Sequence, residues 1–219
     1  MTDIAIVDYG MGNLRSVSKA LEHVAPGASI TVTEDPEVVR RAGRVVVPGQ
    51  GAMPDCLREL EMRGLREAVM NAAMSKPFLG ICIGLQMLFD SSEEGNVEGL
   101  GIVPGRVRRF LPTARPGASE TGVTNGQRFK VPHMGWNEVH QSANHPLWKG
   151  IPGNARFYFV HSYYVENAIP SQAAAFSLYP SPFTCAVAKD NIFAVQFHPE
   201  KSHNAGLALL RNFVQWEPA

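Results

Sequence analysis

A cysteine flanked by glycines is the first feature of the sequence that could do chemistry. The segment Gly80-Ile81-Cys82-Ile83-Gly84 lies between a predicted strand and a predicted helix, which is the pattern of a nucleophile elbow with Cys in the place of Ser. The glycines allow a sharp turn, and the start of a helix favours thiolate over thiol. The same pentapeptide fits a small buried residue in a strand-to-helix turn equally well, so a second signal is needed.

A histidine and a glutamate supply that signal. The segment Phe197-His198-Pro199-Glu200 closes another predicted strand, and a parallel sheet can bring this end to the same edge as Cys82. Pro199 disfavours helix at His198, and residues i and i+2 share a face in extended chain, so Glu200 can bind one imidazole nitrogen. The other nitrogen can then take a proton from Cys82. By itself His-Pro-Glu is more often a strand-end turn, but together the segments predict a Cys82, His198 and Glu200 catalytic triad.

Two other features could serve the same reaction. Pro48-Gly49-Gln50-Gly51 follows a predicted strand, and its glycines free backbone N–H groups to donate to a reacting oxygen. A plain glycine turn is the competing interpretation. Gln86 follows Cys82 by about one helical turn and shares its face, so its amide could bind the polar end of a substrate. A capping or surface role is the alternative there.

Other kinds of site find little support. Gly10-Met11-Gly12-Asn13-Leu14-Arg15 begins like a dinucleotide fingerprint, but Arg15 replaces the third glycine. The sequence has no phosphate-loop lysine motif and no metal-ligand spacing of Cys or His, so we expect neither a metal nor another cofactor. Cys56 and Cys185 lack an elbow or a helix start, and we expect them to be structural.

The predicted elements of the first half alternate between strand and helix. Predicted strands are Ile4 to Val7, Ile30 to Val32, Arg44 to Val47 and Phe78 to Ile81. Between them, a helix capped by Asn13 carries Leu14, Val17, Leu21 and Val24, and a second runs from Asp55 to Ala73 with a break at Gly64. A further helix is predicted after Cys82, with Leu85, Leu88 and Phe89 on its buried face. This alternation predicts βαβ units and a mostly parallel sheet flanked by helices.

The second half is richer in strands, so we expect antiparallel additions to the sheet. Predicted strands are Ile102 to Phe110, Phe129 to Pro132, Phe157 to Val160, Ala173 to Ser177, Thr184 to Ala188 and Ile192 to Phe197. The stretch Pro112 to Gln127 reads as an exposed loop, and a closing helix is predicted from Asn204 to Trp216. With no repeat or linker in the sequence, we expect one α/β domain spanning residues 1–219.

Charge and cysteine usage limit the partners and the compartment. The chain has 219 residues, with 20 Lys+Arg and 20 Asp+Glu, giving a formal net charge of zero. That balance argues against broad electrostatic binding to nucleic acid or to an anionic membrane. The start Met1-Thr2-Asp3-Ile4 does not predict a secretory signal, and no apolar run reaches the roughly 18 residues of a membrane span. The odd number of cysteines, three, suits a reducing compartment. We therefore expect a cytoplasmic protein.

Longer blocks of sequence carry a family resemblance. Gly80 to Gln86, His198-Pro199-Glu200 and Pro48 to Gly51 resemble the class I (triad) glutamine amidotransferases. Within that class the chain resembles the glutaminase subunits of imidazole glycerol phosphate synthase. The blocks behind this narrower resemblance are Asp8 to Val17, Pro132 to Asn137, Tyr158 to Tyr163 and His198 to Ser202.

The resemblance implies a flavodoxin-like α/β fold with an open site that hydrolyses glutamine. It implies that glutamine lies near Gly49, Gly51, Gln86 and the Ser162-Tyr163 segment. The family works as a heterodimer with a (βα)8-barrel cyclase. There, ammonia reacts with a phosphoribulosyl-formimino intermediate to give imidazole glycerol phosphate and an aminoimidazole carboxamide ribotide. Many members carry an apolar residue where this chain has Gln50, so the peptide here could need to rotate before an N–H faces the site.

A surface for such a partner can also be predicted. Trp136 follows Gly135, and Lys201 follows Glu200; tryptophan is a common interface anchor, and a lysine can pair with a partner carboxylate. The alternative places Trp136 in the core and leaves Lys201 as a solvated charge. Two other functions stay open at this point: a glutaminase serving a different acceptor, as in the anthranilate or pyridoxal phosphate systems, and a non-catalytic regulatory module on the same fold.

Overall fold

The first half of the chain alternates strands and helices, as its sequence predicts. The computed structural model describes residues 3–110, 121–124 and 127–218. The elements of the first half are β1 (Ile4–Val7), α1 (Leu14–Val24), β2 (Ile30–Thr33), α2 (Pro36–Arg41), β3 (Arg44–Gly49), α3 (Met53–Met62), α4 (Arg66–Ser75), β4 (Phe78–Cys82) and α5 (Ile83–Gln86). The predicted break at Gly64 separates α3 from α4, and Gly64 has a positive φ of 66°.

The second half is rich in strands and adds one long helix. Its elements are β5 (Phe89–Ser92), β6 (Val97–Glu98), β7 (Val103–Arg109), β8 (Thr121–Thr124), β9 (Gln127–Lys130), β10 (His133–Glu138), β11 (His140–Gln141), the 3-10 turn η1 (Pro146–Trp148), β12 (Arg156–His161), β13 (Tyr163–Asn167), η2 (Pro170–Gln172), β14 (Ala173–Leu178), β15 (Pro182–Lys189), β16 (Ile192–Val195), η3 (Pro199–Lys201) and α6 (His203–Gln215).

The main sheet joins a parallel part to an antiparallel part. Its strand order is β2-β1-β3-β4-β16-β15-β13-β7-β5-β6. The pairs from β2 to β16 are parallel, in the order of flavodoxin-like folds. β15, β13 and β7 continue the sheet in antiparallel pairs. The expected flavodoxin-like α/β fold with antiparallel additions is therefore confirmed.

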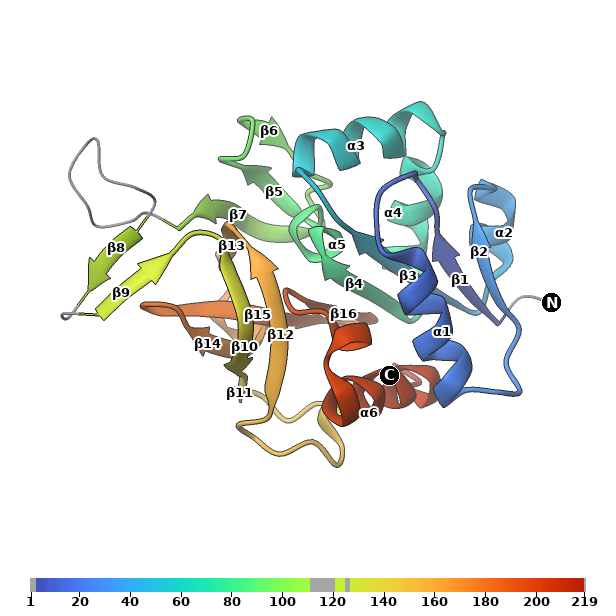
Figure 1. The fold of residues 1–219 in the computed structure, drawn as a ribbon. Helices are drawn as coiled ribbons and strands as arrows, with labels where there is room; N and C mark the ends of the chain where they lie inside the picture. The colour runs from blue at the N-terminus through green and yellow to red at the C-terminus, as the bar shows by residue number, and fades with distance from the viewer. Residues whose placement is uncertain (1–2, 111–120, 125–126, 219) are drawn as a thin grey trace.

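Helices cover both faces of the parallel strands, which is why those strands are almost uniformly apolar. Every residue of β1 and of β4 is buried, as expected for strands packed on both sides. α1 packs on α6 and α2 on α4, and Figure 1 shows α1 and α6 in front of the sheet with α4 behind it. Within the part of the chain that the structure describes, no helix has the length and apolar character needed to cross a membrane.

The helix predicted after Cys82 is much shorter than expected. α5 ends at Gln86, and Phe89 begins strand β5. The carbonyl of Leu88 accepts from the backbone N–H groups of Ile102 and Val103 instead of from the next helical turn. Leu88 and Phe89 are buried as predicted, but in a turn and a strand. The apolar spacing of these residues is compatible with a helix and with a strand, and hydrogen bonds to residues 99–103 favour the strand.

Three smaller predictions were also wrong. Asn13 stands at the start of α1, but its side chain makes no capping hydrogen bond. Thr121–Thr124, placed in an exposed loop, forms β8 and pairs with β9, which begins at Gln127, the last residue of the predicted loop; residues 112–120 and 125–126 lie outside the described residues. β10 and β13 were not predicted as strands. In β10 the apolar residues Met134 and Trp136 lie on an exposed face, so its sequence resembles neither a fully buried strand nor one with a buried apolar face.

Candidate active site

Cys82 is the last residue of β4 and stands at the first turn of α5. Its φ of 58° and ψ of −107° lie in a region that non-glycine residues rarely adopt. Both flanking glycines are sterically required: a Cβ on Gly84 would lie 1.9 Å from the Val47 carbonyl oxygen, and one on Gly80 would lie 2.6 Å from the Gly84 oxygen. The sharp turn predicted from the glycines is present. Because α5 is a single turn, its dipole is weaker support for a thiolate than the expected longer helix.

His198 reaches the same sheet edge from the neighbouring strand. β16 is parallel to β4, with Val195 opposite Ile81, so the segments that follow the two strands meet beside Cys82. His198 Nδ1 lies 2.9 Å from Glu200 Oε1, and the two side chains are 4% and 1% exposed. Glu200 does not reach the ring through extended chain, as expected from spacing: Pro199–Lys201 forms the 3-10 turn η3, which folds the carboxylate back onto His198.

A second set of hydrogen bonds holds this turn. The Ser202 hydroxyl donates to the His198 carbonyl at 2.6 Å and accepts from the Tyr158 backbone N–H at 3.0 Å. The His198 backbone N–H donates to the Tyr158 carbonyl at 2.9 Å. β12 thus supports the imidazole from behind, and the ring orientation is set by backbone as well as by Glu200.

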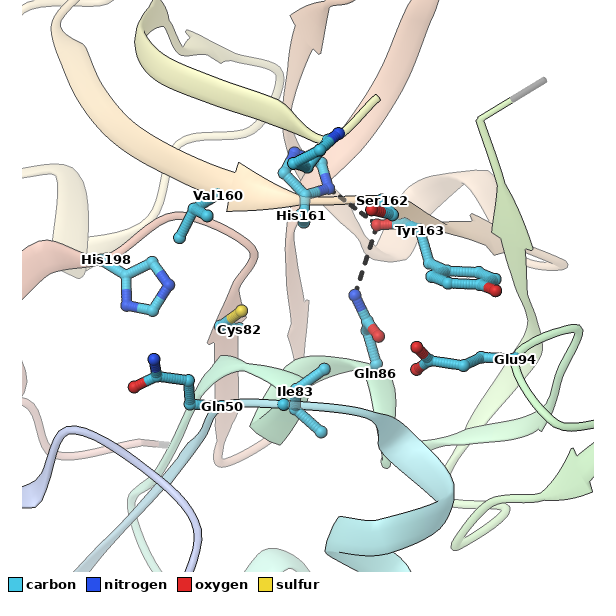
Figure 2. A pocket seen from close by; sticks show the side chains of 12 residues that line it. Gln50, Cys82, Ile83, Gln86, Glu94, Val160, His161, Ser162, Tyr163 and His198 are labelled. Carbon is cyan, nitrogen blue, oxygen red and sulfur yellow. Dashed lines mark hydrogen bonds between the residues drawn. The ribbon is translucent and has the colours of Figure 1, made fainter. Parts of the chain in front are cut away.

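The surroundings of His198 favour its protonated form. Burial opposes the imidazolium, but the Cys82 sulfur and then the Glu200 carboxylate outweigh it and raise the pKa of His198 to about 10. His198 Nε2 is buried and has no hydrogen-bond partner among the described residues, and Figure 2 shows the ring beside Cys82. These surroundings favour an imidazolium at His198, beside the sulfur with which it would exchange a proton.

A cavity of about 280 Å³ opens over the Cys82 sulfur. Its size is close to the lower end of small-molecule sites, roughly 300 Å³. The lining residues are Gln50, Gly51, Cys82, Ile83, Gln86, Glu94, Pro132, Val160, His161, Ser162, Tyr163 and His198. Figure 2 shows Cys82 in the middle, with His198 on one side and Gln86 on the other.

Most residues predicted to bind the substrate line this cavity. Gly51, Gln86, Ser162 and Tyr163 do so; Gly49 does not. Gly49 ends β3 opposite Cys82, and a Cβ there would meet Ile83 Cβ at 2.6 Å and the Tyr9 hydroxyl at 2.7 Å. The glycine at 49 is therefore required by close packing behind the elbow.

Two residues near the cavity, one of them in contact with the sulfur, were missed from the sequence. Gln196 is fully buried, and its Nε2 donates to Cys82 Sγ at 3.7 Å. Glu94 lines the cavity, and its carboxylate accepts from the Met53 backbone N–H at 2.7 Å; burial raises its pKa. Gln196 could have been found from its place two residues before His198, on the same strand face. Glu94 had no such signal, since Glu93-Glu94-Gly95 reads as a solvated turn.

The other cysteines lie in apolar surroundings. Cys56 and Cys185 are buried and free. Burial raises the pKa of Cys56 to about 11 and that of Cys185 still further, which disfavours thiolate at either position. In the described ranges 3–110, 121–124 and 127–218, no group of His, Cys, Asp and Glu gathers that could hold a metal ion.

Trp136 and Lys201 lie together on the surface. Trp136, on β10, is 39% exposed and stacks on His203 with ring centroids 4.9 Å apart. Lys201 Nζ lies over the Tyr158 ring, 5.8 Å from its centroid, and Tyr158 also packs edge-on against Trp136. With Met134, which is 62% exposed, these residues form what we call the aromatic patch. Trp136 is not a core residue, and Lys201 is not a fully solvated charge.

Comparison with known proteins places the chain among enzymes with this architecture. A family model described as "Glutamine amidotransferase class-I" matches residues 5–216. The chain is 74% identical to imidazole glycerol phosphate synthase subunit HisH of Nitrosospira multiformis, and 62% identical to that of Nitrosomonas europaea. Each of these alignments covers 100% of both sequences.

Solved structures agree on the fold. PurLQS from Thermotoga maritima superposes with a TM-score of 0.69 at 16% identity, covering 98% of this chain and 99% of that one. The likeness in fold, the family model and the full-length identities together establish that the chain belongs to the class I glutamine amidotransferases and, within them, to the family of imidazole glycerol phosphate synthase HisH subunits.

Proposed function

We propose that the chain is the glutaminase subunit of an imidazole glycerol phosphate synthase: it hydrolyses glutamine to glutamate and ammonia and passes the ammonia to a cyclase subunit. The observation that carries the chemistry is the buried Cys82 in its elbow, beside a His198 that is hydrogen bonded to Glu200. The 74% identity to a HisH subunit over its full length supports the choice of acceptor reaction over the anthranilate or pyridoxal phosphate alternatives.

The first half of the reaction forms a thioester. The Cys82 thiolate attacks the side-chain carbonyl carbon of glutamine, and the C=O electron pair moves onto oxygen. His198, protonated at Nε2, then gives this proton to the amide nitrogen, and the C–N bond breaks to release ammonia. Glu200 stays ionised throughout: it holds the ring by Nδ1 and stabilises the imidazolium.

The second half returns the enzyme to its starting state. His198, now neutral, takes a proton from water at Nε2 while the water oxygen attacks the thioester carbon. Collapse of the intermediate breaks the C–S bond, so the product leaves as the carboxylic acid and loses its proton to solvent to become glutamate, while the thiolate reforms and His198 stays protonated. Glycine N–H groups near Gln50 would receive the oxyanion in both halves, each typically worth about 3 kcal/mol.

Acceptor groups at the far side of the cavity suit the α-ammonium of glutamine. Gln86 Oε1 is buried without a hydrogen-bond partner among the described residues, and the Glu94 carboxylate faces the same cavity. Figure 2 shows both across from His198. Ser162 and Tyr163, beside Gln86, whose amide donates to the Tyr163 carbonyl, complete a site in which the side-chain amide of glutamine points at Cys82.

The aromatic patch is our candidate for docking the (βα)8-barrel cyclase. It lies beside the triad, since Tyr158 bonds the His198 backbone, so a partner seated there would cover the site mouth and keep ammonia from water. Exposed aromatic residues with one cation are typical interface anchors. We expect the isolated chain to hydrolyse glutamine slowly, and the cyclase with its ribotide ligand to raise turnover.

Docking is tested with Trp136→Ala, using Met62→Ala as a matched control because Met62 is also exposed, at 73%, but lies on α3. Trp136→Ala is expected to weaken the cyclase complex by about 2 kcal/mol, some thirtyfold in Kd. Isothermal titration with purified cyclase measures this loss. Equal Kd values for the two variants would reject the patch as the docking surface.

The remaining parts of the proposal follow from the reaction. We propose one amidotransferase domain over residues 1–219, which works in the cytoplasm, where histidine is made, and needs no cofactor, nucleic acid or membrane. Cys82→Ala tests the reaction itself: in the complex it should lose glutamine-dependent formation of imidazole glycerol phosphate and keep the ammonium-dependent reaction. A variant that still uses glutamine would rule out Cys82 as nucleophile, and a parent chain inactive on glutamine with the partner present would favour a regulatory module.

A further inference from the structure

Two buried histidines lie behind the cavity and take no part in the reaction above. His133 begins β10 and His161 ends β12, and the two are opposite each other in this antiparallel pair. They are 3% and 6% exposed, and His133 Nδ1 lies 2.9 Å from His161 Nε2. Phe110, Phe159 and Phe183 pack around their rings. Only His161 lines the cavity.

The partners of this pair fix where its protons lie. His161 Nδ1 is 2.7 Å from the Tyr163 carbonyl oxygen, which can only accept, so Nδ1 carries the hydrogen and Nε2 must accept from His133 Nδ1. His133 Nε2 then accepts from Asn137 Nδ2 at 3.2 Å, and that amide also donates to the Leu178 carbonyl. Each ring is neutral in this pattern. Burial lowers the pKa of His133 to about 4 and that of His161 to about 3, which agrees with it.

The hydrogen bonds continue from Tyr163 to the nucleophile. Gln86 Nε2 donates to the Tyr163 carbonyl at 3.3 Å and to Gln196 Oε1 at 3.0 Å. Figure 2 shows the Tyr163 carbonyl receiving both His161 and Gln86. Gln196 Nε2 in turn donates to Cys82 Sγ at 3.7 Å. Because both hydrogens of Gln86 are used, its Oε1 is left in the cavity as an acceptor.

We propose that this chain of hydrogen bonds is a positioning network for the glutaminase reaction. His161 holds the Tyr163 carbonyl and through it aims Gln86 Oε1 at the substrate, while Gln196 holds the Cys82 sulfur. His161 and Gln196 are thus positioning residues, and His133 and Asn137 lock the tautomer of His161. The inference rests on the glutaminase function proposed above. It also joins β10, which bears the aromatic patch, to the sulfur by an unbroken series of contacts.

Two substitutions of His161 separate positioning from packing. His161→Asn keeps an N–H donor at the place of Nδ1, facing the Tyr163 carbonyl, but loses the ring. His161→Phe keeps a ring among the aromatic side chains but loses both nitrogens. Positioning predicts that the phenylalanine variant is the more impaired, and packing predicts the reverse.

The measurement is saturation labelling of Cys82 in the full chain by an electrophilic glutamine analogue, 6-diazo-5-oxo-norleucine. It yields a half-saturation concentration, which reports binding, and a maximal rate constant, which reports attack. His161→Phe is expected to raise the half-saturation concentration about tenfold with little change in the maximal rate, and His161→Asn to raise it less than threefold. The opposite order, or two variants like the parent, would overturn the proposal.

Gln196→Met tests the other end, since methionine keeps the length of the side chain and removes its donor. It is expected to lower the maximal labelling rate about tenfold. Methionine also removes the Oε1 atom that accepts from Gln86. In the double variant with His161→Phe, the ratio of maximal rate to half-saturation concentration should therefore fall by less than the product of the two single effects, because both changes release Gln86. Losses that multiply would mean two independent sites and no network.

Two controls distinguish loss of the network from misfolding of a variant and from failure of the proposed function. Thermal unfolding of each variant is compared with the parent, and if His161→Phe does not fold, His161→Gln replaces it, because that longer amide faces His133 instead of the Tyr163 carbonyl. The same tenfold rise is expected of it. A parent chain that the analogue labels neither alone nor in complex with the cyclase and its ribotide ligand would reject the glutaminase function, whereas a labelled parent with unaffected variants would reject the network alone.

Discussion

His198 and the pair His133–His161 are buried to a similar extent, but the pKa of His198 is raised whereas the pKa values of the pair are lowered. His198, His133 and His161 are all less than one-tenth exposed, and burial disfavours the imidazolium at each. At His198 the Cys82 sulfur and Glu200 outweigh burial and raise the pKa to about 10. At the pair, aromatic rings and a neutral carbonyl offer no such charge, and the pKa values fall to about 4 and about 3. The charged partners of a buried histidine, and not how deeply it is buried, therefore decide whether its imidazole is protonated or neutral.

The largest expected effect comes from removing the proton carrier. His198→Asn should reduce glutaminase turnover by about 10²- to 10⁴-fold, because neither the ammonia nor the attacking water can then exchange a proton with Nε2. Turnover is measured as glutamate formation in the complex with cyclase and ribotide ligand. The control is His145→Asn, since burial also lowers the pKa of His145 but it lies outside the cavity. Similar losses in both variants would show that His198 does not differ in function from other buried histidines.

A smaller effect is expected from Glu200→Gln. The amide can still hold the ring, but it removes the charge that helps to raise the pKa of His198. Turnover should fall less than in His198→Asn, and the alkaline limb of the pH–rate profile should move to lower pH because the imidazolium is lost sooner. A variant worse than His198→Asn, or one with an unshifted alkaline limb, would show that Glu200 is not the third member of the triad.

His133, His161 and His145 should make the free energy of unfolding fall as the pH is lowered. Their folded-state pKa values, about 3 to 4, lie below the unfolded value of roughly 6.5, so the unfolded chain binds protons first. Stability is present above that pH and is lost as the pH falls from about 6.5 towards 4, by at most ~1.4 kcal/mol per pH unit for each histidine. His198, with its raised pKa, adds no slope there.

Urea unfolding at several pH values between about 6.5 and 4.5, roughly the window in which the unfolded chain gains protons at these three histidines before the folded chain does, measures this loss. His161→Asn should flatten the dependence by one histidine relative to the parent. An unfolding free energy independent of pH in the parent would contradict the assignment of neutral, buried rings.

The proximity of Cys82, His198 and Glu200 was predictable from the sequence because it depends on local patterns at the ends of parallel strands. The glycines around Cys82 and the proline after His198 act on their own neighbours, and β4 and β16 are uniformly apolar. The short α5 was not predictable, because whether Leu88 and Phe89 continue a helix or join a sheet depends on chain more than ten residues away. Glu94 and His161 reach the cavity, and His133 reaches His161, through the second half of the chain, whose strand register no local pattern sets.

The central claim is that Cys82, alone among the cysteines, carries the acyl group of glutamine. It is tested most directly by reacting the full chain with 6-diazo-5-oxo-norleucine, digesting it and locating the adduct by mass spectrometry. We expect a single adduct, on Cys82, absent after Cys82→Ala and much slower to form in His198→Asn, with Cys56 and Cys185 unmodified. An adduct on Cys56 or Cys185, or labelling that persists in Cys82→Ala, would contradict it.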